Sequence, residues 1–181
     1  FTLACPAFPE NGRTIFRGHL FVQDQLLSES GMQHHPLTPM GDANLVRVLQ
    51  SQTQLSVGLL RYDSVAAGVD ATRQKIAELR EQGVGIAIAD ALSDQDLYTL
   101  GSACADLPLL TGGSGLALGL PDNFRRAGKL RDFDVASLPV VGGGEVVLAG
   151  SASVATLGQV AAWREAGRPA LRIDPLAVAR P

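Results

Sequence analysis

The chain has 181 residues, of which 46% are hydrophobic and 18% charged, and its formal net charge is −3. This length corresponds to one domain or slightly more, and the charge gives no electrostatic basis for binding nucleic acid. No apolar run approaches the roughly 20 residues that cross a bilayer, so we expect a soluble, cytoplasmic protein with no membrane partner.

The first predicted elements are a strand and a hairpin. Residues 1–5 are apolar and β-prone, and a turn-rich loop follows them. Residues 14–16 and 19–22 flank the pair Arg17-Gly18, and a two-residue spacing of this kind predicts an antiparallel β-hairpin. Residues 28–39, with two prolines, are expected to form a loop.

Alternating apolar runs and helix-length segments follow the loop. The expected elements are a helix over 43–50 capped by Asp42, a strand over 56–60, a helix over 65–82, a strand over 84–90, a helix from Ser93 to about Ala105, a strand from Leu109 and a short helix over 116–120. Because strands and helices recur at βαβ spacing, we expect a mostly parallel sheet with flanking helices. Ser93 and Asp96 have the spacing of a capping box.

The C-terminal third of the chain is predicted to begin a second α/β domain. Its expected elements are a strand over 145–149, a helix over 154–166 and a strand over 169–173. The expected organisation is therefore the C-terminal part of a first domain over 1–120, a linker over 121–144 and the start of a second domain over 145–181. Because the chain starts within a strand and has no initiator Met, we expect it to be a piece of a longer polypeptide.

Two predicted strands end in residues that suit ligand binding. Asp90 closes one apolar run, and the turn at 112–114 closes the next. Parallel strands end at one edge of the sheet, where ligands of open α/β sheets bind, so both are expected to line one crevice. Asp90 could act as a base or bind a hydroxyl group, and a carboxylate that caps a helix or braces a loop is an equally common alternative.

The glycine turn Thr111-Gly-Gly-Ser-Gly115 is the strongest local motif. Backbone N–H groups at such a strand-to-helix junction can hold an anion, although the glycines could equally serve close packing. A nucleophile elbow would need glycine in place of Leu116, so Ser114 is expected to donate a hydrogen bond rather than attack a substrate. The turn at 150–153 lacks the G-K-[ST] ending of a P-loop, but its hydroxyl groups could still contact phosphate.

Arg13 and Arg61 are candidates for binding a carboxylate, because a guanidinium group matches its geometry in a bidentate way. Solvated surface arginines are the alternative for each. The pair His34-His35 has no third ligand at metal-site spacing, so we expect no metal site in the chain. Cys5 and Cys104 lie far apart without CxxC spacing, which is typical of reduced, buried thiols in the cytosol.

Six motifs, taken in order along nearly the whole chain, resemble the four-carbon acid sugar kinases. They are Ala4-Cys-Pro-Ala-Phe-Pro-Glu-Asn-Gly-Arg13, Gly18-His-Leu-Phe-Val22, Glu29-Ser-Gly-Met32, His35-Pro-Leu-Thr-Pro-Met40 with Asn44-Leu45, Leu109-Leu-Thr-Gly-Gly-Ser-Gly-Leu116, and Gly150-Ser-Ala-Ser-Val-Ala-Thr156 with Gln159-Val160. Their order is more specific than any one of them.

The resemblance implies a kinase that transfers the γ-phosphoryl group of ATP to the terminal hydroxyl of a four-carbon sugar acid such as 3-oxo-tetronate. Mg²⁺ would bridge the phosphates, the first domain would hold the sugar acid and the second the nucleotide. A homodimer is also expected. The candidate residues are Arg13, Arg61, Asp90, Gly113 and Ser114 for the sugar acid, and Ser151 and Ser153 for ATP.

The chain also departs from the family pattern. The acidic motif that opens the family's first domain and most of the nucleotide domain are missing, and Ala152 stands where cysteine is expected. We therefore expect the chain to be inactive by itself, and the sequence assigns no catalytic base. A non-catalytic remnant that binds acid sugars is the alternative.

Overall fold

A four-stranded parallel sheet forms the centre of the first unit of the computed structural model, which describes residues 1–35, 37–130, 142–151 and 153–179. The chain divides into two compact units, Phe1–Phe133 and Asp134–Pro181. The sheet has the order β5-β6-β1-β7, with every neighbouring pair parallel. Its strands are β1 (Thr2–Cys5), β5 (Val57–Leu60), β6 (Ile86–Ala89) and β7 (Leu110–Gly112). The predicted α/β class with a mostly parallel sheet is confirmed.

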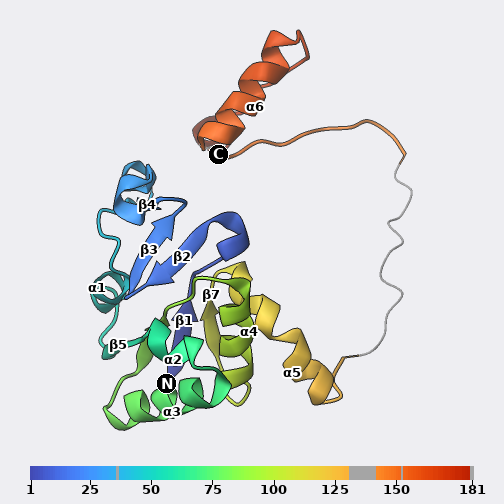
Figure 1. Ribbon diagram of the computed structural model, residues 1–181. Coiled ribbons are helices and arrows are strands. Elements are labelled where there is room, and N and C mark those ends of the chain that lie inside the picture. The colour runs from blue at the N-terminus through green and yellow to red at the C-terminus, as the bar shows by residue number, and fades with distance from the viewer. Residues whose placement is uncertain (36, 131–141, 152, 180–181) are drawn as a thin grey trace. The chain divides into compact units, whose positions relative to one another are not determined.

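Helices also occur in the first unit (Figure 1). They are α1 (Leu45–Gln50), α2 (Tyr62–Ala66), α3 (Val69–Glu81), α4 (Asp94–Ala103) and α5 (Pro121–Arg126), with the 3-10 helices η1 (Pro9–Asn11), η2 (Leu27–Glu29), η3 (Met32–His34) and η4 (Ser114–Gly119). Of these, α2, α3 and α4 lie beside the parallel sheet (Figure 1). The capping box at the start of α4 is confirmed, because the Ser93 side chain accepts from the Asp96 N–H while the Asp96 carboxylate accepts from the Ser93 N–H.

Several helix boundaries differ from the prediction. The helix expected over 65–82 is two helices, because Gly68 takes a φ of +99° between α2 and α3 and so interrupts the helical backbone. The N-cap of α1 is Asn44, whose side chain accepts from the Arg47 N–H, while Asp42 forms an ion pair with Arg47. A helix, α5, occupies the start of the expected linker, and residues 131–141 of that linker lie outside the described residues.

A small antiparallel sheet lies beyond the carboxyl end of β1 (Figure 1). It consists of β2 (Arg13–Phe16), β3 (His19–Val22) and β4 (Gln25–Leu26). The predicted hairpin is confirmed, with Arg17 and Gly18 at φ values of +48° and +75°, as a tight two-residue turn requires. Ile15 and Ala91 exchange backbone hydrogen bonds of 2.8 and 3.0 Å, which join the hairpin to the segment after β6.

The core of the first unit contains both cysteines. Cys5 is fully buried at the end of β1, and Cys104 is 2% exposed at the end of α4. Burial raises the pKa of each thiol from 9.0 to about 12. The expectation of buried thiols is confirmed.

The two thiols give a prediction for alkaline pH. Above pH 9 the unfolded chain releases thiol protons that the folded chain keeps up to about pH 12, so folding stability should fall as pH rises through this window. Thermal unfolding followed by circular dichroism between pH 8 and 11 measures the slope. The double variant Cys5→Ala, Cys104→Ala should show a shallower decline. If the melting temperatures of the wild type and the double variant fall equally with pH, the decline does not come from the two thiols.

The second unit contains two helices in its described residues, α6 (Val154–Glu165) and α7 (Pro175–Val178). The strands expected over 145–149 and 169–173 are not formed within 142–151 and 153–179, which corrects the prediction. Val147 and Leu171 are 80% and 88% exposed. A strand is stable only when its backbone groups are paired, and the described residues of this unit contain no strand that could pair with either segment. None of the described helices is long and apolar enough to cross a membrane.

Candidate functional site

The carboxyl edge of the parallel sheet brings together most of the candidate residues of the first unit. Because all four strands are parallel, the chain leaves them on the same side, at Pro6, Arg61, Asp90 and Gly113. The antiparallel sheet with Arg13 is joined to this edge through Ala91. The sequence-based expectation that Asp90 and the glycine turn share one edge therefore agrees with the topology.

Asp90 is fully buried at this edge. Its Oδ2 accepts hydrogen bonds from the backbone N–H groups of Arg17 (2.9 Å) and Tyr62 (3.0 Å), and its Oδ1 accepts from the N–H of Gly18 (2.8 Å). Both oxygens are thus occupied, as a buried carboxylate requires. Of the two alternatives that the sequence left open, this geometry favours a carboxylate that braces a loop over one that contacts a ligand.

The glycine turn after β7 packs closely on the loop that follows β1. A Cβ atom on Gly112 would collide with the backbone carbonyl of Cys5, and one on Gly115 would lie 3.0 Å from the Phe8 Cα. The Gly113 N–H donates to the Cys5 carbonyl at 3.2 Å. Close packing therefore accounts for Gly112 and Gly115, whereas Ser114 is exposed at the start of η4.

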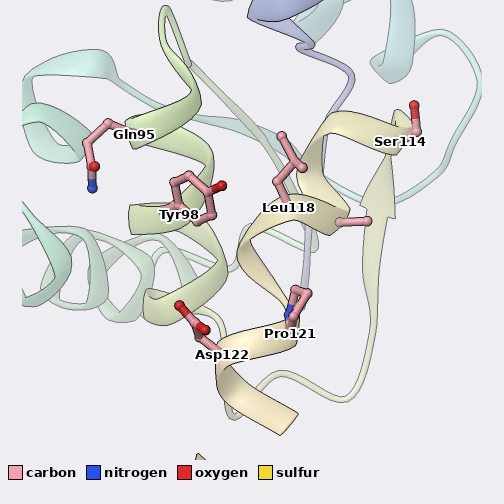
Figure 2. Close-up of a pocket in the computed structure, with 7 residues that line it drawn as sticks. Gln95, Tyr98, Ser114, Leu118, Pro121 and Asp122 are labelled. Atoms are coloured by element: carbon pink, nitrogen blue, oxygen red, sulfur yellow. The ribbon is translucent and has the colours of Figure 1, made fainter. Parts of the chain in front are cut away.

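An open hollow lies between α4, η4 and the start of α5 (Figure 2). It is lined by Gln95, Tyr98, Ser114, Ala117, Leu118, Pro121 and Asp122. Figure 2 shows Gln95 and Tyr98 on one side of the hollow and Ser114 and Leu118 on the other. Of these residues, the sequence pointed to Ser114 alone. Tyr98 could have been found as an aromatic residue of an amphipathic helix, and in the structure it is 42% exposed.

The two candidate arginines have different surroundings. Arg61 is the N-cap residue of α2, and its guanidinium donates to Asp63 at 2.9 Å in a groove that also contains Lys75 and Glu78. Arg13 begins β2 and is exposed, and no ion pair involves it within residues 1–35 and 37–130. Because alternate residues of a strand share a face, Arg13 lies on the same face of β2 as the buried Ile15.

Ser151 and Ser153 precede α6 in the second unit. The Ser153 hydroxyl caps this helix by accepting from the Thr156 N–H at 3.2 Å, and the Ser151 hydroxyl accepts from the Ser153 N–H at 3.1 Å. Both side chains are exposed, so their hydroxyl groups remain accessible to a ligand.

The histidine pair of the sequence lies in the first unit. There, His35 Nδ1 accepts a hydrogen bond from the Thr38 N–H at 3.0 Å.

A family model and several curated proteins match this chain. A family model described as a sugar-binding N-terminal domain matches residues 1–120. A 3-oxo-tetronate kinase of Pseudomonas fluorescens is 85% identical over 179 residues, which are 99% of this chain and 42% of the relative. The chain thus spans about two fifths of the length of this curated relative.

Two solved structures are similar to this chain in fold and sequence. The crystal structure of a Haemophilus influenzae protein of the DUF1537 family is 45% identical, with a TM-score of 0.69 over 91% of this chain and 39% of that chain. A Bordetella bronchiseptica structure, described as a DUF1537 domain with bound citrate and as a domain-swapped dimer, is 25% identical. Its TM-score is 0.55 over 68% of this chain and 29% of that chain.

Proposed function

The chain belongs to the family of the sugar-binding N-terminal domain, as its resemblance to the four-carbon acid sugar kinases led us to expect, and we propose that it supplies the acid-sugar-binding part of such a kinase. The observation that carries this proposal is the 85% identity, along 99% of the chain, to a protein named 3-oxo-tetronate kinase. Because the chain covers 42% of that relative, the activity of the whole protein is part of the proposal.

The substrate in this proposal is a four-carbon sugar acid of the 3-oxo-tetronate type, and the reaction transfers the γ-phosphoryl group of ATP to its terminal hydroxyl. The protein's contribution to phosphoryl transfer is mainly to position the reactants and to stabilise charge. Arg13 would bind the carboxylate of the acid through its guanidinium group, and Ser114 would donate a hydrogen bond to a hydroxyl group. The citrate recorded for the Bordetella bronchiseptica relative, a tricarboxylate with one hydroxyl group, supports recognition of a carboxylate by this family.

The nucleotide side of the proposal rests on the second unit. The exposed hydroxyl groups of Ser151 and Ser153 would contact the phosphates of ATP. No cluster of three His, Cys, Asp or Glu side chains that could hold a metal occurs in the described parts of the chain. We therefore assign no Mg²⁺ ligand to this chain, and Mg²⁺ would enter as a partner of the ATP phosphates.

The proposal is tested on the natural gene product that contains this chain. ADP release is followed by a coupled assay with ATP and Mg²⁺ over a panel of four-carbon sugar acids, and the phosphorylated carbon of the product is located by ³¹P NMR. We expect one acid of the 3-oxo-tetronate type to release ADP and to carry the phosphate at its terminal position. Binding of an acid in calorimetry without ADP release would instead favour a non-catalytic binding protein.

The assembly and location of the protein are further proposals. We propose a homodimer, supported by the domain-swapped dimer recorded for the Bordetella bronchiseptica relative, and a cytoplasmic location, since ATP and sugar acids are available there. Light scattering of the purified gene product at several concentrations measures its oligomeric state. Fractionation of the cells measures whether the protein is in the cytoplasm. A monomer at all concentrations would contradict the dimer.

A further inference from the structure

The buried carboxylate of Asp90 connects three segments that are distant in the sequence. It follows β6, and its oxygens accept from Arg17 and Gly18 in the β2–β3 turn and from Tyr62 at the start of α2. The distances are all between 2.8 and 3.0 Å. One side chain therefore joins the antiparallel sheet, the β5–α2 junction and the parallel sheet.

The turn that Asp90 holds contains a residue in an energetically unfavourable backbone conformation. Arg17 has a φ of +48°, a conformation that residues with a Cβ adopt at an energetic cost. Hydrogen bonds from backbone N–H groups to an ionised oxygen are stronger than those to a neutral one. The carboxylate thus compensates for the strained backbone, and the antiparallel sheet is fixed next to the Ile15–Ala91 bridge.

The same contacts determine where candidate ligand-binding side chains lie. Arg13 is four residues before Arg17 on the strand that enters the turn, and Arg61 directly precedes Tyr62. The Phe16 ring, which also precedes the turn, packs edge-on against Tyr62 with 6.0 Å between ring centroids. A displacement of the turn would therefore move Arg13 relative to Arg61 and the edge of the parallel sheet.

We propose that Asp90 is the positioning residue of the sugar-acid site: without touching the ligand, it fixes the β2–β3 hairpin, and with it Arg13, on the carboxyl edge of the parallel sheet. This inference rests on the proposed function, because it concerns the geometry of the same site. It assigns to Asp90 a role that differs from a base or a hydroxyl ligand. It also explains why a charged side chain is fully buried outside any ion pair recorded for the described residues.

The test compares Asp90→Asn with a matched variant in the natural gene product. Asn keeps the size of the side chain but replaces one acceptor oxygen by a donor that faces backbone N–H groups. Asp96 is the control, because it is 6% exposed and its Oδ2 accepts from the N–H groups of Leu92 and Ser93, but it braces the start of α4 and not the hairpin. Asp96→Asn should lower the melting temperature to a similar degree.

The expected result is a split between the two substrates. Asp90→Asn should raise the KM for the sugar acid at least about tenfold while the KM for ATP stays within about twofold, and Asp96→Asn should leave both within about twofold. A folded Asp90→Asn protein with the wild-type KM for the sugar acid would overturn the inference. Equal increases in this KM for Asp90→Asn and Asp96→Asn would also overturn it, because the effect would then follow general destabilisation.

A second readout separates this inference from the proposed function. Amide hydrogen exchange measured by mass spectrometry should show faster exchange of the peptide containing Arg17 and Gly18 in Asp90→Asn than in Asp96→Asn. Unchanged exchange in this peptide would overturn the role of Asp90 even if the enzyme is a kinase. A wild-type protein that binds no four-carbon acid would overturn the proposed function, whatever the exchange rates.

Discussion

Replacing Gly101 with alanine is expected to destabilise the protein by roughly 1 to 3 kcal/mol, which corresponds to a fall in melting temperature on the order of 5–10 °C. Gly101 lies in α4, where a Cβ atom would collide with the backbone carbonyl of Gly119 in η4. Its own carbonyl accepts from the Asn123 side chain in α5 at 2.7 Å. Backbone atoms cannot move aside as a flexible side chain can, so α4 and η4 must separate. Thermal unfolding of the purified natural gene product measures the effect.

The matched control is the same substitution at Gly158. This glycine lies inside α6, and among the described residues no atom outside this helix lies within 4 Å of the position of its Cβ atom. Alanine is favoured over glycine in a helix interior by about 1 kcal/mol, so Gly158→Ala should not lower the melting temperature. If both variants unfold at the wild-type temperature, the close contact between α4 and η4 does not contribute to stability as the geometry indicates.

The parallel sheet could be predicted because each buried strand is a continuous apolar run. Residues 86–89 read Ile-Ala-Ile-Ala, and turn or helix signals bound them on both sides. The capping box of α4 was also predictable, since it depends on two residues at fixed spacing. The break at Gly68 was not, because a glycine within a helical pattern is as often tolerated as disruptive.

The second unit shows what a local pattern leaves undetermined. The runs Val146-Val-Leu148 and Leu171-Arg-Ile173 have strand composition, yet the described residues of this unit form no strand. A strand depends on hydrogen bonds to a neighbour, and the neighbour is a property of the whole sheet rather than of the segment. A helix makes its hydrogen bonds within itself, so α6 forms where the sequence predicts it.

The candidate site was partly predictable from the expected parallel sheet. Parallel strands fix which residues share an edge, and this placed Asp90 and the Gly113–Ser114 turn together. The sequence could not show that Asp90 accepts from Arg17 and Gly18, because these residues are more than 70 positions away along the chain. The predicted β-hairpin therefore supplies two of the backbone N–H groups that donate to the Asp90 carboxylate.

The replacement of Arg13 by alanine should have the largest effect on substrate binding if the proposed function is right. A hydrogen bond to a charged group contributes about 1.5 to 3 kcal/mol, which corresponds to a KM for the sugar acid raised roughly 10- to 100-fold. Arg61→Ala should have a smaller effect, because Arg61 is already paired with Asp63 at 2.9 Å. Steady-state kinetics of the natural gene product with the acid that releases ADP measures both values.

Two further variants make this prediction specific to the guanidinium group. Arg13→Lys keeps the charge but loses the planar, bidentate donor, so its KM should lie between those of wild type and Arg13→Ala. Arg80→Ala removes an exposed arginine from the last turn of α3, which precedes the amino end of β6 and so lies at the opposite edge of the sheet. Its KM should equal that of wild type. Equal KM values for Arg13→Ala and Arg80→Ala would remove Arg13 from the site and would show that the face of β2 shared with Ile15 does not bind the acid.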